Sequence, residues 1–246
     1  MNVYACSDIH GQYSLFRQML DGISFSDDDF LYILGDVIDR GPGSIPMLQD
    51  IMGRENIICI MGNHELMMYT EYRLPGKESY WLHSSNGGRA TQKDFEKLSA
   101  AEQEQTLDFI ESMALQIDLE VDGTRYLLSH SDFIRERDSV LFRDVDYRVA
   151  FDTVWNSPWR MWEYVTKRKY SKDGRFHVIG HVPVQYVQEN PVKTNAYIDK
   201  KHKIINIDLG CARIGNQGHV DGHSLCCMNL TAYSNGAGTD AFTYYS

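Results

Sequence analysis

The feature that most constrains the fold is a short apolar run that ends in metal-binding side chains. Residues 30–34 (FLYIL) are apolar, with β-branched and aromatic members, and lead directly into the loop Gly35-Asp36-Val37-Ile38-Asp39-Arg40-Gly41. The run is short enough to be one buried strand, and the two glycines let the loop turn tightly. Such a strand delivers two carboxylates and a guanidinium to the open end of a sheet. Taken alone, the loop has an equally good structural explanation, in which Asp36 forms a turn and Asp39 and Arg40 form a surface ion pair.

The same pattern occurs at four other places in the chain. The apolar runs and the side chains that follow them are residues 3–6 before Asp8 and His10, 57–61 before Asn63 and His64, 126–128 before His130, and 177–179 before His181. Carboxylate, amide and imidazole groups are donors of the kind that bind Mn, Fe or Zn, and no thiolate is among them. Five strand ends therefore carry the same chemistry.

Helical periodicity separates the first three of these runs. Residues 15–20 have apolar side chains at helical spacing, and Gly22 stands where a left-handed C-cap would end that helix. The pattern repeats over residues 45–52, with Gly53 closing the helix, and a third helix is expected to open at His64 and Glu65. This strand and helix order predicts parallel strands with right-handed crossovers, so the loops should emerge at one sheet edge.

The later part of the chain predicts a second sheet packed on the first. Residues 117–121 and 125–128 flank an Asp122-Gly123 turn and should form a hairpin, and residues 203–207 and 224–230 should form further strands. Between the two regions, Ser99 to Glu102 has the form of a helix capping box.

Taken in order, these motifs resemble the calcineurin-like metallophosphoesterases, and within them the phosphoprotein phosphatase type. The matching motifs are Asp8-x-His10-Gly11, Gly35-Asp36-x-x-Asp39-Arg40-Gly41, Gly62-Asn63-His64-Glu65, a lone His130 after a strand, and Gly180-His181. They span residues 8–181, and the ordered set is far more specific than any one motif. The resemblance implies an α/β fold of two mixed sheets in a sandwich flanked by helices, with a dinuclear metal site at the C-terminal ends of strands.

The resemblance also implies a set of metal ligands. One ion would be held by Asp8, His10 and Asp36, and the other by Asp36, Asn63, His130 and His181. Asp36 would bridge the two ions, and a bridging water made acidic by both would attack the phosphorus. Mn is the expected metal, with Fe or Zn as alternatives.

The remaining catalytic roles follow from the same resemblance. His64 would be the general acid that protonates the leaving group, held protonated by Asp39, and Arg40 would bind phosphate oxygens. The family commonly uses a second phosphate-binding arginine, for which Arg160 is the best candidate in this chain. Its competitors are Arg135, Arg143 and Arg148.

Two segments lie outside the motifs that carry the resemblance. Residues 131–176 hold three tryptophans and the basic run 167–169, and we expect them to form a cap or specificity segment, with the basic run as a solvated face. The chain also has Ser131-Asp132 where the family often has glycine after the ligand. Trp81 and the stretch 86–91 (NGGRAT) lie near the substrate in the bacterial branch that this chain resembles, although a tight turn explains the glycines equally well.

Composition supports one globular unit. The 246 residues fit a single domain, 1–246, and the net charge of −10 disfavours a general nucleic-acid surface. No apolar run approaches a membrane span, and no signal peptide is plausible before the first strand, so we expect a cytoplasmic protein without a membrane partner. The five cysteines should be buried, reduced thiols, with Cys226 and Cys227 pointing to opposite faces of a strand. His219 and His223 are expected at the surface.

These features favour a Ser/Thr-type phosphoprotein phosphatase that hydrolyses phosphomonoesters. The alternative is a symmetrical diadenosine tetraphosphate hydrolase, which shares the motifs and would need an aromatic stacking platform such as Trp81 or Trp155. A third possibility is a non-enzymatic module that keeps the metals for stability. It is disfavoured because Asp39, His64 and Arg40 have no necessary structural role. The substrate would be a phosphoprotein or a phosphorylated small molecule or nucleotide.

Overall fold

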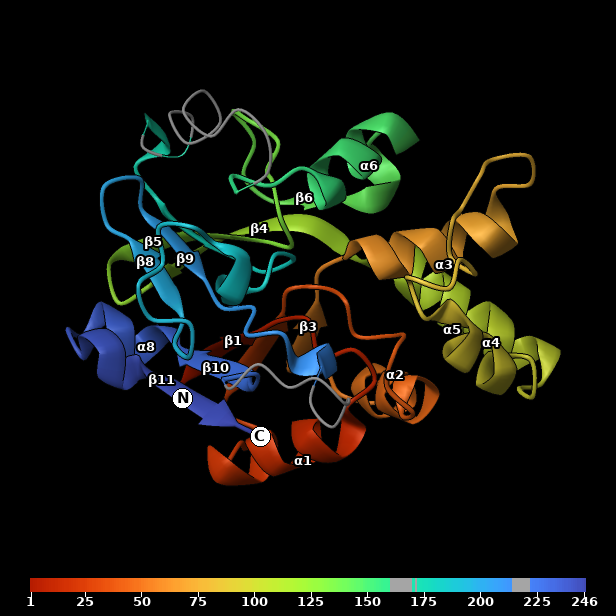
Figure 1. The fold of residues 1–246 in the computed structure, drawn as a ribbon, viewed down its shortest axis with the longest axis horizontal. Coiled ribbons are helices and arrows are strands. Elements are labelled where there is room, and N and C mark those ends of the chain that lie inside the picture. The colour runs from red at the N-terminus through yellow and green to blue at the C-terminus, as the bar shows by residue number, and fades with distance from the viewer. Residues whose placement is uncertain (160–169, 171, 214–221) are drawn as a thin grey trace.

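The computed structural model describes residues 1–159, 170, 172–213 and 222–246, which form two β-sheets with flanking helices (Figure 1). The first sheet has the order β11-β10-β1-β2-β3. Its strands are β1 (Val3–Cys6), β2 (Phe30–Ile33), β3 (Ile57–Cys59), β10 (Leu225–Asn229) and β11 (Phe242–Tyr245). The predicted α/β sandwich of two mixed sheets is confirmed.

The second sheet has the order β6-β4-β5-β7-β9-β8. Its strands are β4 (Ala114–Val121), β5 (Thr124–Ser129), β6 (Val140–Leu141), β7 (Phe176–Ile179), β8 (Tyr197–Asp199) and β9 (Ile204–Asn206). The hairpin between β4 and β5 turns at Asp122 and Gly123, both with positive φ, as the Asp-Gly pair predicts.

Parallel pairing in both sheets gathers the chemistry at one edge. β1 pairs with β2 and β2 with β3, all parallel, with α1 (Tyr13–Gly22) and α2 (Ser44–Met52) as the crossovers. In the second sheet β5, β7 and β9 are parallel as well. Since parallel strands end at the same edge, the loops after β1, β2 and β3 meet those after β5, β7 and β9.

The remaining helices cover the outer faces. They are α3 (Asn63–Arg73), α4 (Gly88–Phe95), α5 (Ala100–Ser112), α6 (Tyr147–Trp155) and α8 (Leu230–Ser234), with short 3₁₀ turns η1 (Phe142–Asp144), η2 (Val184–Tyr186), η3 (Cys211–Arg213) and η4 (Gly238–Ala241). α3 packs against α5 and α6 (Figure 1). The predicted capping box starts α5, with Ser99 Oγ accepting from the backbone of Glu102 and the Glu102 carboxylate accepting from Ser99 N.

Two large apolar layers fill the described part of the protein, and a smaller cluster around Leu127 and Ile179 covers the other face of the second sheet. One lies between the sheets and includes Leu128, Val178 and Cys226, whereas the other lies beneath the helices and includes Phe16 and Cys227. The neighbouring cysteines therefore point to opposite faces of β10, as alternation along a strand requires. All five cysteines are buried and unpaired, as predicted. Among the described residues, no helix is long and apolar enough to cross a membrane.

Two local predictions were wrong. Gly22 is the last residue of α1 rather than a left-handed cap, and the left-handed residue after this helix is Ser24, with φ +52°. The glycine at 22 instead lets the Tyr245 ring of β11 pack closely, because an added Cβ would lie 2.7 Å from that ring. His223 is 8% exposed and lies beside Gly210 rather than at the surface. His219 lies outside the described residues.

Arg175 links the segment that precedes β7 to β4 of the second sheet. Its guanidinium donates to Asp173 and Asp118, the latter at 2.7 Å, and its side chain is 6% exposed. Burial tends to raise the pKa of Asp173, but hydrogen bonds and charges from Arg175 and His177 bring it well below its usual range. This cluster therefore stabilises the fold through the ionised carboxylate.

We expect Asp173→Asn to lower the free energy of unfolding at pH 7 by about 1–2 kcal/mol, because a charge-assisted hydrogen bond is lost. The folded-state pKa of Asp173 lies below its unfolded value, so its stabilisation is present above roughly pH 4 and is lost as pH falls. Urea unfolding at pH 7 and pH 3 measures this difference. Asp94→Asn is the control, since Asp94 pairs with Lys97 on the open surface. A deficit of equal size at both pH values would contradict the explanation.

Candidate active site

The backbone of the site is strained at the residues that the sequence predicts to be functional. Six non-glycine residues of the site have φ between +49° and +75°, in the left-handed region: Asp8, His10, Asp36, Asp39, Arg40 and His181. Non-glycine residues adopt this region at an energetic cost, and such residues cluster at functional sites where the surrounding structure holds them. The loops are therefore held by contacts rather than by local preference.

Glu65 supplies many of these contacts. Its carboxylate accepts hydrogen bonds from the backbone N–H groups of Asp36 (2.9 Å), Val37 (2.8 Å) and Ile38 (3.2 Å), and from that of Gly62 (2.9 Å). Burial and the charge of Asp36 raise the pKa of Glu65 to about 7, whereas the N–H donors and His64 oppose this rise. This role of Glu65 cannot be read from the sequence, although the residue belongs to the Gly62–Glu65 motif.

The loop after β2 also passes very close to its neighbours. Gly35 has φ +82°, and an added Cβ would lie 2.6 Å from Gly62 and 2.8 Å from His130 Nδ1. Contacts this short exclude any side chain at this position. The glycine therefore brings the loops after β2, β3 and β5 together.

One group of predicted ligands converges on His130. Its Nε2 lies 3.0 Å from Asn63 Oδ1, 3.2 Å from His181 Nδ1 and 3.5 Å from Asp36 Oδ1. Its Nδ1 donates to the Leu34 carbonyl at 2.7 Å, and burial lowers its pKa, so the neutral ring presents a bare Nε2. Three acceptor atoms, His130 Nε2, Asn63 Oδ1 and Asp36 Oδ1, then face one another. A cation among them would stabilise this arrangement.

A second group surrounds the other oxygen of Asp36. His10 Nδ1 donates to the Ile38 carbonyl at 3.0 Å, which leaves Nε2 as an acceptor 3.4 Å from Asp36 Oδ2. Burial lowers the pKa of His10 as well. Asp8 lies deeper, where its Oδ2 accepts from the His181 backbone N–H at 3.0 Å. Arg40 Nη1 donates to His10 Nε2 at 2.8 Å.

The donor set fits two divalent ions that share Asp36. Two compact groups of side chains could each hold an ion, His10 with Asp36 and His64, and Asp36 with His130 and His181. Asp8 is absent from the first group, and His64 stands there although the sequence predicts it as the acid rather than a ligand. Carboxylate and neutral imidazole donors suit Mn, Fe or Zn.

Asp208 is an acidic residue of the site that the sequence analysis missed. It is 2% exposed, and burial together with the charge of Asp36 raises its pKa to about 7. Burial and the charges of Asp208 and Asp36 likewise raise the pKa of Asp8. Bound cations would offset these crowded carboxylates. The signal was present, because the mostly apolar run 204–207 ends in Asp208 just as the other five runs end in predicted ligands.

His64 and Asp39 form a buried pair beside the ligands. His64 Nδ1 donates to Asp39 Oδ2 at 2.6 Å, and the two side chains are 1% and 0% exposed. Burial alone would lower the pKa of His64, but the charges of Asp36 and Asp39 and this hydrogen bond raise it overall. Arg40 is exposed, and its Nη2 lies 3.2 Å from His64 Nε2. An imidazole, an orienting carboxylate and a guanidinium therefore stand together.

The two candidate stacking tryptophans differ in position. Trp81 is fully buried and donates from Nε1 to Asp39, so the expectation that it could stack on a nucleobase was wrong. Trp155 is half-buried at the end of α6, with its ring edge-on to His181 at a centroid distance of 5.9 Å. Trp155 thus lies against a predicted metal ligand.

Ser131 and Asp132, which stand where the resemblance suggests glycine, tie β5 to α6. Ser131 Oγ donates to the Asn156 carbonyl, and Asp132 N donates to the Thr153 carbonyl at 2.9 Å. The polar residues therefore anchor the segment that follows the predicted ligand His130.

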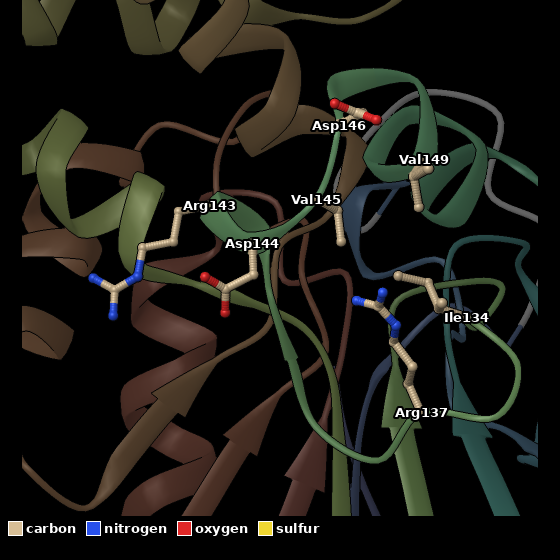
Figure 2. A pocket seen from close by; sticks show the side chains of 7 residues that line it. All are labelled: Ile134, Arg137, Arg143, Asp144, Val145, Asp146 and Val149. Atoms are coloured by element: carbon tan, nitrogen blue, oxygen red, sulfur yellow. The ribbon is translucent and has the colours of Figure 1, made fainter.

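The predicted second arginine, Arg160, lies outside the described residues. Of its competitors, Arg148 pairs with Asp152 on α6, and Arg135 is exposed. Arg143 lines a pocket of about 500 Å³ between the loop after β5 and the start of α6, shown in Figure 2. The lining residues are Ile134, Arg137, Arg143, Asp144, Val145, Asp146 and Val149, and none of them is a predicted metal ligand. Arg213, which sequence reasoning did not consider, acts by its charge on Asp208.

Comparison with known proteins gives consistent results. A sequence model described as calcineurin-like phosphoesterase matches residues 1–211. Over 74 residues the chain is 43% identical to a symmetrical bis(5'-nucleosyl)-tetraphosphatase of Wigglesworthia glossinidia brevipalpis, covering 29% of this chain and 27% of that protein. Over 136 residues it is 29% identical to serine/threonine-protein phosphatase 2 of Escherichia coli strain K12, covering 54% and 59%. The chain thus spans less than two thirds of the length of these curated relatives.

Solved structures share the fold. A metallophosphoesterase from Sphaerobacter thermophilus superposes with a TM-score of 0.56 at 15% identity, covering 100% of this chain and 87% of that one. A protein serine/threonine phosphatase from Saccharomyces cerevisiae superposes with a TM-score of 0.55 at 15% identity, covering 84% and 66%. At these identities the likeness concerns the fold alone.

We expect Asp36→Asn to lose both metal ions, because an amide cannot offer two anionic oxygens to two cations. Metal analysis after dialysis against limiting Mn measures the stoichiometry. Asp39→Asn is the matched control, since Asp39 is buried in the same loop but pairs with His64. Equal metal content in the two variants would contradict the shared role of Asp36.

Proposed function

Since this chain belongs to the calcineurin-like phosphoesterase family, we propose that it is a metal-dependent hydrolase of the Ser/Thr phosphoprotein phosphatase type that acts on phosphomonoesters. The observation that carries the proposal is the placement of the His64–Asp39 pair and Arg40 beside two ligand groups that share Asp36. The ligands of the two ions are assigned as Asp8, His10 and Asp36, and as Asp36, Asn63, His130 and His181.

Two divalent ions at these ligands, most naturally Mn, would supply charge neutralisation of the phosphoryl oxygens and a water acidic enough to attack phosphorus. The chain itself orients the ligands. The Leu34 and Ile38 carbonyls fix the tautomers of His130 and His10, so each ring turns an unprotonated Nε2 toward Asp36.

Arg40 and His64 are suited to bind and protonate the ester. When His64 is protonated, its Nε2–H and the Arg40 guanidinium are both donors, and they lie 3.2 Å apart. An anionic oxygen placed between them accepts from both, which a phosphate ester provides. His64 then passes its proton to the leaving oxygen, while Asp39 holds the ring through Nδ1.

A symmetrical dinucleoside tetraphosphate hydrolase is the second candidate function. It is supported by the identity shared with the symmetrical tetraphosphatases and by the place of Trp155 against His181, where an aromatic face could receive a base. We place substrate choice in the segment 131–176 of a single catalytic domain, 1–246. A metal-binding module without catalysis is disfavoured because it would leave the Asp39–His64 pair without a purpose.

The proposal is tested by assaying metal-stripped protein with and without added Mn on three substrates. These are p-nitrophenyl phosphate, a phosphothreonine peptide and diadenosine tetraphosphate. We expect turnover to depend on Mn and to be faster on the peptide than on the dinucleotide. Preference for the dinucleotide would select the second candidate. No turnover on any substrate, with Mn bound, would favour the non-catalytic module.

We expect His64→Ala to keep its metal and to lower kcat on phenyl phosphate by roughly 100-fold or more, because a positioned general acid contributes about that much. The loss on p-nitrophenyl phosphate should be much smaller, since that leaving group needs little protonation. Metal content and kcat on both esters are the measurements. His83→Ala, an exposed histidine bonded to Ser85, is the control. Equal losses on the two esters would rule out the acid role.

A further inference from the structure

We propose that Trp81 is a positioning residue for the reaction, and that its indole N–H acts through the Asp39 carboxylate to hold His64 in place. The inference rests on the proposed function, because it concerns the residue predicted to protonate the leaving group. It gives a role to the Trp81 and Asn86–Thr91 stretch.

The Asp39 carboxylate has two hydrogen-bond donors in the described part of the chain. His64 Nδ1 donates to Oδ2 at 2.6 Å, and Trp81 Nε1 lies 2.9 Å from Oδ2 and 3.1 Å from Oδ1. Asp39 and Trp81 are both 0% exposed, and His64 is 1% exposed. A buried carboxylate needs donors to replace the lost water, and the indole N–H is one of the two that Asp39 has among the described residues.

The surrounding sequence holds the indole against Asp39. An added Cβ at Gly88 would lie 2.7 Å from Trp81 Nε1, so only glycine leaves room for this ring at the start of α4. Three residues later, Thr91 Oγ1 accepts from the Asp39 backbone N–H at 3.1 Å. Gly87 O accepts from Arg40 N at 3.4 Å. The 81–91 segment therefore packs on the Asp39–Arg40 turn from behind.

Loss of the indole donor should affect one step of the reaction. Without Trp81 Nε1–H, Oδ1 of Asp39 loses its hydrogen-bond donor among the described residues. The carboxylate is then free to rotate away from His64. The ring then loses the contact that directs its Nε2 toward the leaving oxygen. The metal ligands do not depend on this contact. The defect should therefore grow as the leaving group becomes poorer, which a general loss of packing would not produce.

Trp81→Phe removes the donor and keeps an aromatic ring, and Tyr72→Phe is the matched control. Tyr72 packs edge-on to Trp81 at 5.7 Å, so its substitution alters a polar atom of the same aromatic cluster without touching Asp39. With Mn present, we expect Trp81→Phe to lower kcat on phenyl phosphate by about tenfold or more, with a much smaller loss on p-nitrophenyl phosphate and unchanged metal content. Tyr72→Phe should resemble the wild type on both esters.

A double-mutant cycle tests the route of the effect. In an Asp39→Asn background, Trp81→Phe should cause little further loss, because both act on one contact. A loss of equal size in both backgrounds, or an equal loss on the two esters, would overturn the proposal. Gly88→Ala is a second variant, expected to displace the ring and reproduce the leaving-group dependence should Trp81→Phe fold poorly.

A measurement without turnover separates this inference from the proposed function. The 2.6 Å hydrogen bond should give a far-downfield proton resonance for His64 Nδ1–H, assigned by its loss in Asp39→Asn. Trp81→Phe should shift or broaden that resonance, whereas Tyr72→Phe should not. An unchanged resonance in Trp81→Phe would overturn the positioning role. Wild-type protein inactive on every ester would overturn the proposed function, while this resonance still decides the role of Trp81.

Discussion

The arrangement of the site depends on the carboxylate of Glu65, which is not one of the predicted metal ligands. Glu65 stands at the start of α3 and accepts four backbone N–H groups, three of them from the loop after β2. Those donors would otherwise be buried without partners, since the loop itself forms neither a strand nor a helix there. By pairing them, Glu65 helps to hold the loop in which Asp36 and Asp39 adopt left-handed conformations.

The buried charges of the site explain why its loops must be held rigidly. Asp8, Asp36 and Asp208 are buried and lie close enough to perturb one another, which is costly without positive charge nearby. The histidines around Asp36 contribute lone pairs rather than protons wherever a backbone carbonyl accepts from Nδ1. A rigid cluster of acceptors lowers the stability of the folded protein but favours the binding of cations.

Much of this site could be predicted because its polar side chains directly follow the ends of strands. Each of the five apolar runs ends where the polar side chains begin, so the parallel order of the strands brings Asp8, Asp36, Asn63, His130 and His181 together. Residues that act from behind were harder to predict. Glu65 resembles an ordinary acidic residue in the first turn of a helix, and Trp81 is expected to lie near the substrate, but the contacts with Asp36 and Asp39 become visible only in the fold. Gly22 was misjudged for a related reason, because its partner Tyr245 is far away in sequence.

The predicted site of the second ion draws its ligands from both sheets. Asp36 and Asn63 follow strands of the first sheet, whereas His130 and His181 follow strands of the second. An ion held there would act as a cross-link between the layers of the sandwich, and separating the sheets would mean breaking coordination bonds. Loading with metal would then couple the two halves of the chain into one cooperative unfolding unit. In the metal-free protein the layers would be joined at this edge only by hydrogen bonds and packing.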